Sequence, residues 1–308
     1  MHTILGAGGP IANALTAELV NNNQKIRLVS RRTVATTNAN VQWQKADLTN
    51  AVEVLQATKG SAVIYLCAGL VYNKAIWQQQ WPVIMQNVIN AAKENNARLI
   101  FFDNVYMYGL VKGPMLESKT YNPISVKGEV RAKIATQLMD EVKAGNLQAT
   151  IARAADFYGA GSASSVLDNM VLFKYAKGEQ AMWLGKPDTL HSFTYVPDAG
   201  KAIYLLGQRP EADNQIWHLP TAPAITGKQI IEIAANTFHT KPRYMSLNKL
   251  MLQMIGLFDK VVRDSVEMYY QYDHDYSFNS DKFEKAFEVT PTGYQQGIQY
   301  LSQTVFKQ

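Results

Sequence analysis

The first residues that suggest chemistry are the glycines that follow an apolar stretch at residues 2–5. Gly6, Gly9 and Ala12 fit the spacing G-x-x-G-x-x-A, and a helical pattern of apolar residues continues from there. Glycines at such a junction let the backbone approach a pyrophosphate, which the unpaired N–H groups of the helix start then bind. An ordinary strand–helix turn is the alternative, but the place at the start of an alternating strand/helix chain favours a dinucleotide site. The predicted contacts are Gly6, Gly8, Gly9, Pro10 and Ile11.

A basic tripeptide, Ser30-Arg31-Arg32, follows the next strand-like run. An acidic residue at the end of this strand would bind the ribose hydroxyls of NAD and repel a 2′-phosphate. A serine and two arginines instead bind a 2′-phosphate through charge-assisted hydrogen bonds. A solvated basic loop is the alternative interpretation. We therefore predict NADP as the cofactor, with NAD as the alternative.

Two other patterns suggest chemistry that the sequence does not support further. Asp273-His274-Asp275 contains metal-ligand types, but adjacent residues of an extended chain point to opposite sides and no further ligand is evident. We expect a polar loop there and no metal. The chain has no G-x-S-x-G, so esterase chemistry has no support.

The elements that must position these residues alternate regularly through the first half of the chain. Continuous apolar runs at residues 62–68 and 99–102 indicate strands buried on both faces, as in a parallel sheet. Alternating strands and helices give right-handed βαβ units and a doubly wound, Rossmann-type α/β fold. Strands are predicted at residues 2–5, 25–31, 41–47, 61–68, 98–104 and 148–154. Helices are predicted at residues 11–21, 51–58, 77–95 and 127–143.

The regular alternation ends after Gly159, where a loop of small residues begins. The later predictions are a helix at residues 166–177, a strand at 192–196, a helix at 198–207, and short helices at 227–238, 246–258 and 281–287. We predict a dinucleotide-binding domain of residues 1–160 plus about 190–220. Residues 161–189 and 221–308 are predicted to form a smaller, C-terminal substrate lobe.

Composition restricts the function classes. The 308 residues are 47% hydrophobic and 18% charged, which suits a globular protein. The net charge of +5 comes without a lysine or arginine run, so nucleic acid is not an expected partner.

The single cysteine, Cys67, predicts a reducing compartment without disulfides. No apolar stretch reaches membrane-spanning length, and the early first strand leaves no room for a signal peptide. We expect a cytoplasmic monomer or homodimer.

Further segments match one family in both order and spacing. Tyr108-Gly109 ends a loop similar to that family's S-S-x-x-V-Y-G, residues 153–159 match its R-x-x-x-x-Y-G, and residues 195–198 match its Y-V-x-D. Together with the glycine turn, Asp47-Leu48 and residues 87–102, these segments cover roughly the first 205 residues. On them the chain resembles the extended short-chain dehydrogenase/reductases, the NAD(P)-dependent epimerases and dehydratases of nucleotide sugars.

The resemblance implies which residues contact cofactor and substrate. It implies an aspartate at the end of the third strand, Asp47, that contacts adenine. It also implies that His191, near the later strand, contacts the substrate. Apart from the resemblance, the loop of small residues at 161–165 either receives an anionic substrate group or is a flexible connector. The cofactor contacts expected beyond the glycine turn are Ser30, Arg31, Arg32, Asp47, Leu48, Cys67, Ala68, Gly69, Lys127, Ala154 and Asp156. The substrate contacts expected are Tyr72, Ser162 and His191.

The catalytic positions depart from the family pattern. The family uses a Tyr and a Lys four residues apart on one helix face, with a Ser or Thr from the preceding strand end. Here the Ser/Thr position falls on Asn104. If Lys127 is the family's Lys, the Tyr position holds Pro123; in the other register the pair becomes Ile124 and Gly128.

The dyad is broken in both registers, so we expect any activity to use a displaced acid. Tyr108 and Lys112 also have Y-x-x-x-K spacing, but they lie in a loop, and we take this match as a coincidence. Lys127 is the candidate for holding the cofactor, Asn104 for binding a substrate oxygen, and Tyr108 or Tyr121 for donating the proton.

Two functions remain open from the sequence. One is an NAD(P)-dependent oxidoreductase or nucleotide-sugar epimerase/dehydratase-like enzyme that uses a displaced acid. The other is a non-catalytic NADP-binding redox sensor or scaffold. The sizeable C-terminal lobe favours the enzyme, because a sensor needs no substrate cleft.

Overall fold

The computed structural model describes residues 1–159 and 165–306, and its largest feature is a seven-stranded sheet. Every neighbouring pair in this sheet is parallel. The order β11-β6-β5-β4-β1-β2-β3 reverses direction at β1, as in a doubly wound fold. The strands are β1 (His2–Leu5), β2 (Ile26–Ser30), β3 (Val41–Lys45), β4 (Val63–Leu66), β5 (Arg98–Asp103), β6 (Ala149–Arg153) and β11 (Ile216–His218).

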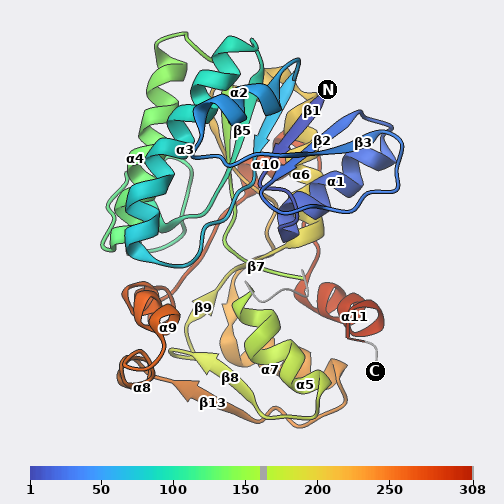
Figure 1. The fold of residues 1–308 in the computed structure, drawn as a ribbon. Coiled ribbons are helices and arrows are strands. Elements are labelled where there is room, and N and C mark those ends of the chain that lie inside the picture. Colours follow the sequence, from blue (N-terminus) through green and yellow to red (C-terminus); the bar gives the residue numbers. More distant parts are fainter. Residues whose placement is uncertain (160–164, 307–308) are drawn as a thin grey trace.

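Helices cover both faces of this sheet (Figure 1). One face carries α2 (Ala51–Thr58), α3 (Lys74–Glu94) and α4 (Val126–Lys143), and the other carries α1 (Pro10–Asn21) and α6 (Val196–Gln208). Two hydrophobic cores result, one on each face. The central strand β4 is buried along its whole length, which explains its continuous apolar sequence.

Helices α1 and α6 pack closely because a glycine lies between them. A Cβ on Gly200 would come within 2.6 Å of the Ala14 Cβ, so no larger residue fits without separating the helices. The predicted Rossmann-type fold is therefore confirmed in its strands, its helices and the parallel pairing of the sheet.

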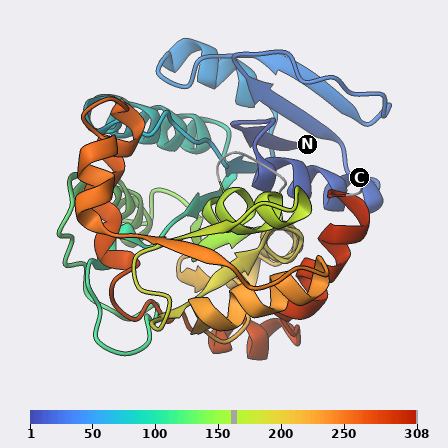
Figure 2. The same ribbon diagram turned by 90° about the horizontal axis from the view of Figure 1, so that it is seen from below.

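The smaller lobe lies across the carboxyl end of the sheet (Figures 1 and 2). Three two-stranded pairs form its β-structure: β7 (Asp156–Tyr158) with β10 (Phe193–Tyr195), β9 (Leu190–His191) with β12 (Ile225–Thr226), and β8 (Ala181–Leu184) with β13 (Tyr244–Leu247). Its helical elements are η2 (Asp168–Leu172), α5 (Phe173–Ala176), α7 (Gly227–Thr237) and α11 (Tyr294–Thr304). These elements share a third hydrophobic core.

The chain from α8 (Lys249–Ile255) through α9 (Lys260–Ser265) and η4 (Val266–Gln271) takes a separate path. It lies on the side of the molecule that carries α3 and α4, in both views (Figures 1 and 2). This segment brings residues from the C-terminal third of the chain to the start of α4.

The structure corrects the helix predicted at residues 246–258. Residues Tyr244–Leu247 form β13, which pairs in parallel with β8, and α8 begins only at Lys249. The Asn248 side chain caps α8 by accepting a hydrogen bond from the Met251 N–H. The apolar residues of β13 matched a helical pattern because a short strand has no clear period of its own.

Among the elements that the sequence-based assignment missed or placed differently, two pack at the central sheet. The strand β11 completes the sheet beside β6, although the pattern around Trp217 gave no strand signal. The helix α10 (Asp281–Phe287) was predicted as part of the substrate lobe. Its Phe283 and Phe287 pack into the core between the sheet and α6.

Candidate cofactor and active site

The glycine turn after β1 has the backbone geometry that its sequence predicts. Gly6 and Gly8 have φ values of +91° and +92°, a region that favours glycine. A Cβ on Gly6 would lie only 2.3 Å from the Ala68 Cα, so this glycine lets the turn pack against the end of β4. By contrast, a Cβ on Gly9 would have the Gly6 carbonyl oxygen as its nearest neighbour, at 3.9 Å. The space in front of Gly9 is therefore open.

The start of α1 offers free backbone donors to this space. Gly9 is the N-cap and Pro10 occupies the first turn, and among the described residues no side chain caps the helix. The first N–H groups of a helix lack intrahelical partners and favour an anion. The turn thus fits a dinucleotide pyrophosphate, which needs close backbone approach and N–H donors together.

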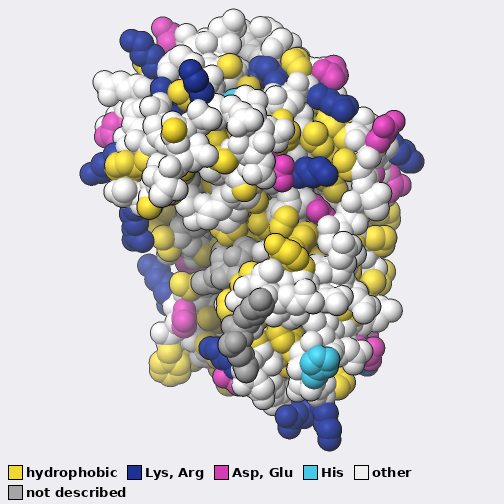
Figure 3. Space-filling view, turned by 90° about the vertical axis from the view of Figure 1, so that its right-hand side faces the viewer, with side chains coloured by type: hydrophobic (Ala, Val, Ile, Leu, Met, Phe, Trp, Pro, Cys, Tyr) yellow, Lys and Arg dark blue, Asp and Glu magenta, His cyan; other side chains and the backbone are white. Residues whose placement is uncertain are grey.

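The basic loop after β2 borders the same turn. A Cβ on Gly8 would contact the Val34 side chain at 3.5 Å, which places this loop beside the glycines. The Ser30 hydroxyl accepts a hydrogen bond from the Trp43 indole at 3.0 Å and donates one to the Arg32 carbonyl oxygen at 2.6 Å. Arg31 and Arg32 are exposed. On the face of the molecule seen in Figure 3, basic side chains are scattered among acidic ones.

Two more predicted cofactor positions lie where β3 and β4 end. Asp47 accepts hydrogen bonds from the Thr49 backbone and hydroxyl, and these bonds lower the pKa of its carboxyl group. The carbonyl oxygen of Leu48 accepts a bond from the Asn87 amide at 3.0 Å. Burial raises the pKa of the Cys67 thiol to about 12, so this cysteine stays an unreactive thiol.

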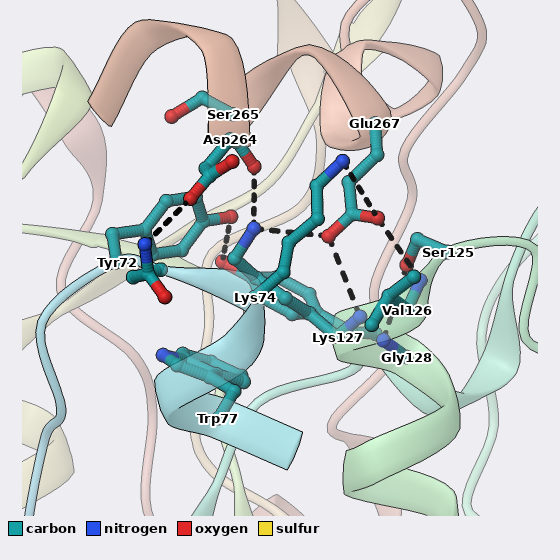
Figure 4. A network of polar contacts seen from close by, with 12 residues as sticks. Tyr72, Lys74, Trp77, Ser125, Val126, Lys127, Gly128, Asp264, Ser265 and Glu267 are labelled. Atoms are coloured by element: carbon teal, nitrogen blue, oxygen red, sulfur yellow. Dashed lines mark hydrogen bonds and ion pairs between the residues drawn. The ribbon is translucent and has the colours of Figure 1, made fainter. Parts of the chain in front are cut away.

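Lys127, the predicted cofactor lysine, is completely buried at the start of α4 (Figure 4). Its ammonium donates to the Glu267 carboxylate at 2.9 Å and to the carbonyl oxygen of Asp264. It also lies 4.2 Å from the centre of the Tyr72 ring. Burial lowers the pKa of Lys127, while Glu267 acts in the opposite direction.

Glu267 also binds the backbone of α4 (Figure 4). Its carboxylate accepts from the N–H of Val126 at 3.0 Å and from the N–H of Lys127 at 3.4 Å. Lys74, at the start of α3, lies 3.8 Å from the same carboxylate. A negative charge at a helix N-terminus is favourable, so Glu267 stabilises both the buried lysine and the end of α4.

One of the two registers considered for the family's Tyr and Lys puts the lysine position at Gly128. A Cβ on Gly128 would lie 2.6 Å from the Tyr106 carbonyl oxygen, so that position has no room for a lysine. Ile124 is mostly exposed, and Pro123 has no proton to donate. Asn104, the expected substrate-binding amide, uses its side-chain oxygen to accept from the Tyr106 N–H at 3.1 Å.

Tyr108 and Tyr121 both contact one buried arginine. Arg153 donates to the Tyr108 hydroxyl at 2.7 Å and to the Tyr121 hydroxyl at 2.5 Å. The His218 Nδ1 lies 2.8 Å from the Asn279 carbonyl oxygen, which can only accept, so Nδ1 carries the hydrogen. His218 Nε2 therefore accepts the Tyr108 proton, at 2.8 Å. Burial raises the pKa of Tyr108 to about 12, and its proton is already donated within the protein.

The predicted residues Asp156 and His191 meet in the smaller lobe. His191 Nε2 donates to Asp156 Oδ2 at 3.1 Å, and the Tyr272 hydroxyl donates to the same oxygen at 2.5 Å. The His191 ring is stacked between Tyr272 and Tyr276, with ring centres 4.9 and 4.4 Å away. This arrangement places an imidazole, a carboxylate and two phenols in one buried group.

Sequence reasoning missed the contributions of η4 and the residues after it. Glu267, Tyr272 and Tyr276 come from a tyrosine-rich stretch that no family motif covers. The density of tyrosines between residues 269 and 276 was the only available signal. The predicted substrate contact Ser162 lies outside the described residues.

The sequence analysis also expected a polar loop without a metal at residues 273–275, and no membrane-spanning segment. The His274 ring bonds to Asp273 at 2.6 Å on the surface. Within residues 1–159 and 165–306, no group of three His, Cys, Asp or Glu side chains could hold a metal. In the same part of the chain, no helix is both long and apolar enough to cross a bilayer.

The fold and the glycine turn define an α/β protein of the dinucleotide-binding class. The model of the NAD dependent epimerase/dehydratase family matches residues 2–219, and the chain belongs to this family. A sequence search of curated proteins gives no match.

Solved structures share the fold at low sequence identity. UDP-glucose 4-epimerase from Thermus thermophilus, solved with NAD, is 14% identical, and the alignment covers 97% of each chain with a TM-score of 0.77. UDP-glucose 4-epimerase from Thermotoga maritima, solved with UDP-glucose, is 15% identical over 99% of this chain and 100% of that one, with a TM-score of 0.78. MoeE5, solved with UDP-glucuronic acid and NAD, is 18% identical over 96% of each chain, with a TM-score of 0.75.

Proposed function

We propose that this protein binds NADP(H) and is an oxidoreductase or epimerase-type enzyme that acts on a small molecule between its two lobes. The observation that carries the proposal is the uncapped start of α1, which faces open space beside Gly9 and is bordered by a basic loop. The backbone of this turn would hold the pyrophosphate. When bound, the dinucleotide supplies or accepts a hydride.

The choice of NADP over NAD rests on the end of β2. Ser30 stands where an acid would bind the ribose hydroxyls of NAD, and the exposed Arg31 and Arg32 follow it. Arginines bind phosphate through charge-assisted hydrogen bonds, which a 2′-phosphate would complete.

The substrate proposal rests on the placement of the smaller lobe. The lobe lies over the carboxyl end of the sheet, where ligands of doubly wound proteins bind. Tyr72, Asn104, Asp156 and His191 lie at or face this end, and we propose them as substrate contacts. Structures of the same fold were solved with UDP-glucose and UDP-glucuronic acid, so a nucleotide sugar is the leading substrate class. The single buried thiol, Cys67, supports a cytoplasmic location.

A specific observation favours a second candidate, a non-catalytic NADP sensor. Lys127 is bound by Glu267 and the Asp264 carbonyl group, and Gly128 has no room for a side chain. A protein that only binds the dinucleotide needs neither residue for proton transfer. Measured turnover decides between the two candidates.

The cofactor proposal is tested with Arg31→Ala. Loss of a charge-assisted bond to the 2′-phosphate should weaken NADPH binding by about 1.5–3 kcal/mol and leave NADH binding nearly unchanged. Calorimetric titration of wild type and variant with both dinucleotides measures this difference. Lys45→Ala, on the neighbouring strand β3, is the matched control for a lost surface charge. Equal losses for NADPH and NADH would remove the NADP assignment.

A further inference from the structure

Five phenols lie around Asp156 at the junction of the two lobes, and two of them stack on His191. We name this group the tyrosine cluster. Its members come from the ends of β4 and β5 and from the chain after α9: Tyr72, Tyr106, Tyr270, Tyr272 and Tyr276. The hydroxyls of Tyr72 and Tyr106 are 3.5 Å apart, which connects the cluster to the Lys127 site.

Backbone hydrogen bonds and ring stacking both hold Tyr276 in place. Its backbone N–H donates to the Leu190 carbonyl oxygen at 2.9 Å, and its carbonyl oxygen accepts from the Ser192 N–H at 3.0 Å. Its ring stacks on His191 with an interplanar angle of 16°. Backbone and ring are therefore both fixed, and Tyr276 is only 5% exposed.

The hydroxyl of Tyr276 has no hydrogen-bond partner among residues 1–159 and 165–306. The backbone of Asp156 lies near it, but without the geometry of a hydrogen bond. Leaving a buried hydroxyl unpaired costs free energy, and such groups in native proteins frequently serve a ligand. The hydroxyls of Tyr108 and Tyr272, by contrast, already donate their protons within the protein.

The surroundings of Tyr276 keep its phenol protonated. Burial, and next the negative charge of Asp156, raise the pKa of Tyr276 well above its usual value. The other titratable groups that pack with it or act on it include His191 and the phenols Tyr106, Tyr108, Tyr270 and Tyr272. Among these groups none is a lysine or arginine that would stabilise a phenolate.

We propose that Tyr276 is the proton donor in the reduction of a ketone or aldehyde whose reacting end carries no charge and binds at the tyrosine cluster. The inference rests on the proposed function, in which bound NADPH supplies the hydride. As hydride forms the new C–H bond, the C=O π bond breaks and its oxygen takes the Tyr276 proton. The phenolate that remains takes a proton from water, so one carbonyl group and one proton become one alcohol for each NADPH oxidised.

The chemistry of the cluster selects the substrate class. Asp156 would repel a carboxylate or phosphate at the reacting end, and Lys127 is already paired with Glu267. A neutral carbonyl group accepts a hydrogen bond from Tyr276 without that repulsion.

The test compares Tyr276→Phe with wild type in two separate measurements. Calorimetric titration with NADPH should give the same affinity within about twofold, because the variant keeps the ring and its stacking. NADPH oxidation with a panel of neutral ketones, aldehydes and keto sugars should fall about 10²–10⁴-fold in kcat, with KM changed far less. Tyr175→Phe is the matched control. Its buried hydroxyl bonds to the Arg243 backbone in the same lobe, and its loss should change kcat only a few-fold.

The pH profile provides a second readout. Because the Tyr276 phenol stays protonated, kcat for reduction should stay flat from neutral pH to about pH 10 in wild type. If NADPH fails to bind, both the proposed function and this inference are overturned. If NADPH binds but wild type reduces no member of the panel, the proton-donor assignment is overturned and the NADP-binding proposal stands. The proton-donor assignment is also overturned if Tyr276→Phe retains its kcat. It is overturned too if a large loss of kcat occurs only in Tyr108→Phe or Tyr121→Phe.

Discussion

His218 shows how burial decides the chemistry of a single residue. Its Nδ1 donates to the Asn279 carbonyl oxygen and its Nε2 accepts from Tyr108, so the folded protein holds a neutral imidazole. Burial lowers the pKa of His218 to about 3, and the Asn279 hydrogen bond opposes this only partly. The unfolded chain takes up a proton near the ordinary value of 6.5.

This difference predicts acid destabilisation. Below pH 6.5 the unfolded state binds a proton that the folded state does not, so stability is complete above that pH and falls as the pH drops towards 3. Between about pH 7 and pH 5, His218 alone should remove about 2 kcal/mol of unfolding free energy. Urea denaturation of wild type and His218→Gln at both pH values measures this. If both proteins lose the same free energy, His218 is not the neutral group that the structure shows.

At the scale of elements, Glu267 joins η4 to the start of α4. It pairs with the buried Lys127 and accepts from the N–H groups of Val126 and Lys127. These contacts attach the segment from α8 to η4 to the domain that contains the seven-stranded sheet. The segment follows a separate path, which can be seen in Figure 2. The contact lies at Lys127, the lysine that the sequence predicted to hold the cofactor.

Glu267→Gln should loosen this connection. Replacing the carboxylate weakens charge-assisted bonds and leaves Lys127 buried without its counter-charge, at a cost of about 1–3 kcal/mol. Hydrogen exchange should become faster in α9 and η4 but stay unchanged in β4 and β5. Glu141→Gln is the control, since Glu141 pairs with Lys93 in a partly exposed salt bridge of small expected effect. Similar exchange in both variants would show that the Glu267 contact does not hold the segment.

At the scale of the whole molecule, cofactor binding should stabilise the folded state. A ligand at about 100 times its dissociation constant adds about 2.7 kcal/mol, which raises the melting temperature by roughly 5 °C in a chain of this size. NADPH should therefore raise the melting temperature more than NADH at equal concentration.

Gly9→Val tests where that stabilisation originates. The position in front of Gly9 is open, so the variant should fold and melt near the wild-type temperature, but its side chain would fill the space for the pyrophosphate. A thermal shift with NADPH that is unchanged in Gly9→Val would place the dinucleotide elsewhere. Gly6→Val is unsuitable, because a Cβ there meets the Ala68 backbone.

The sequence by itself determined six of the seven strands of the sheet, the helices that alternate with them and the glycine turn. These features depend on local pattern: apolar runs for strands buried on both faces, a 3.6-residue period for helices, and glycine where φ is positive. The sequence also has Pro123, Ile124 and Gly128 at the candidate positions of the family's Tyr and Lys, which predicts a broken dyad.

Only the tertiary structure decided which groups surround the candidate active site. Glu267 meets Lys127 across 140 residues of chain, and Tyr272 meets Asp156 across 116. No periodicity encodes such contacts, because they depend on the path of α8, α9 and η4 across the end of the sheet. For the same reason Tyr108, which sequence spacing made a candidate donor, is bound to Arg153 and His218, whereas Tyr276 has a buried hydroxyl without a partner among the described residues.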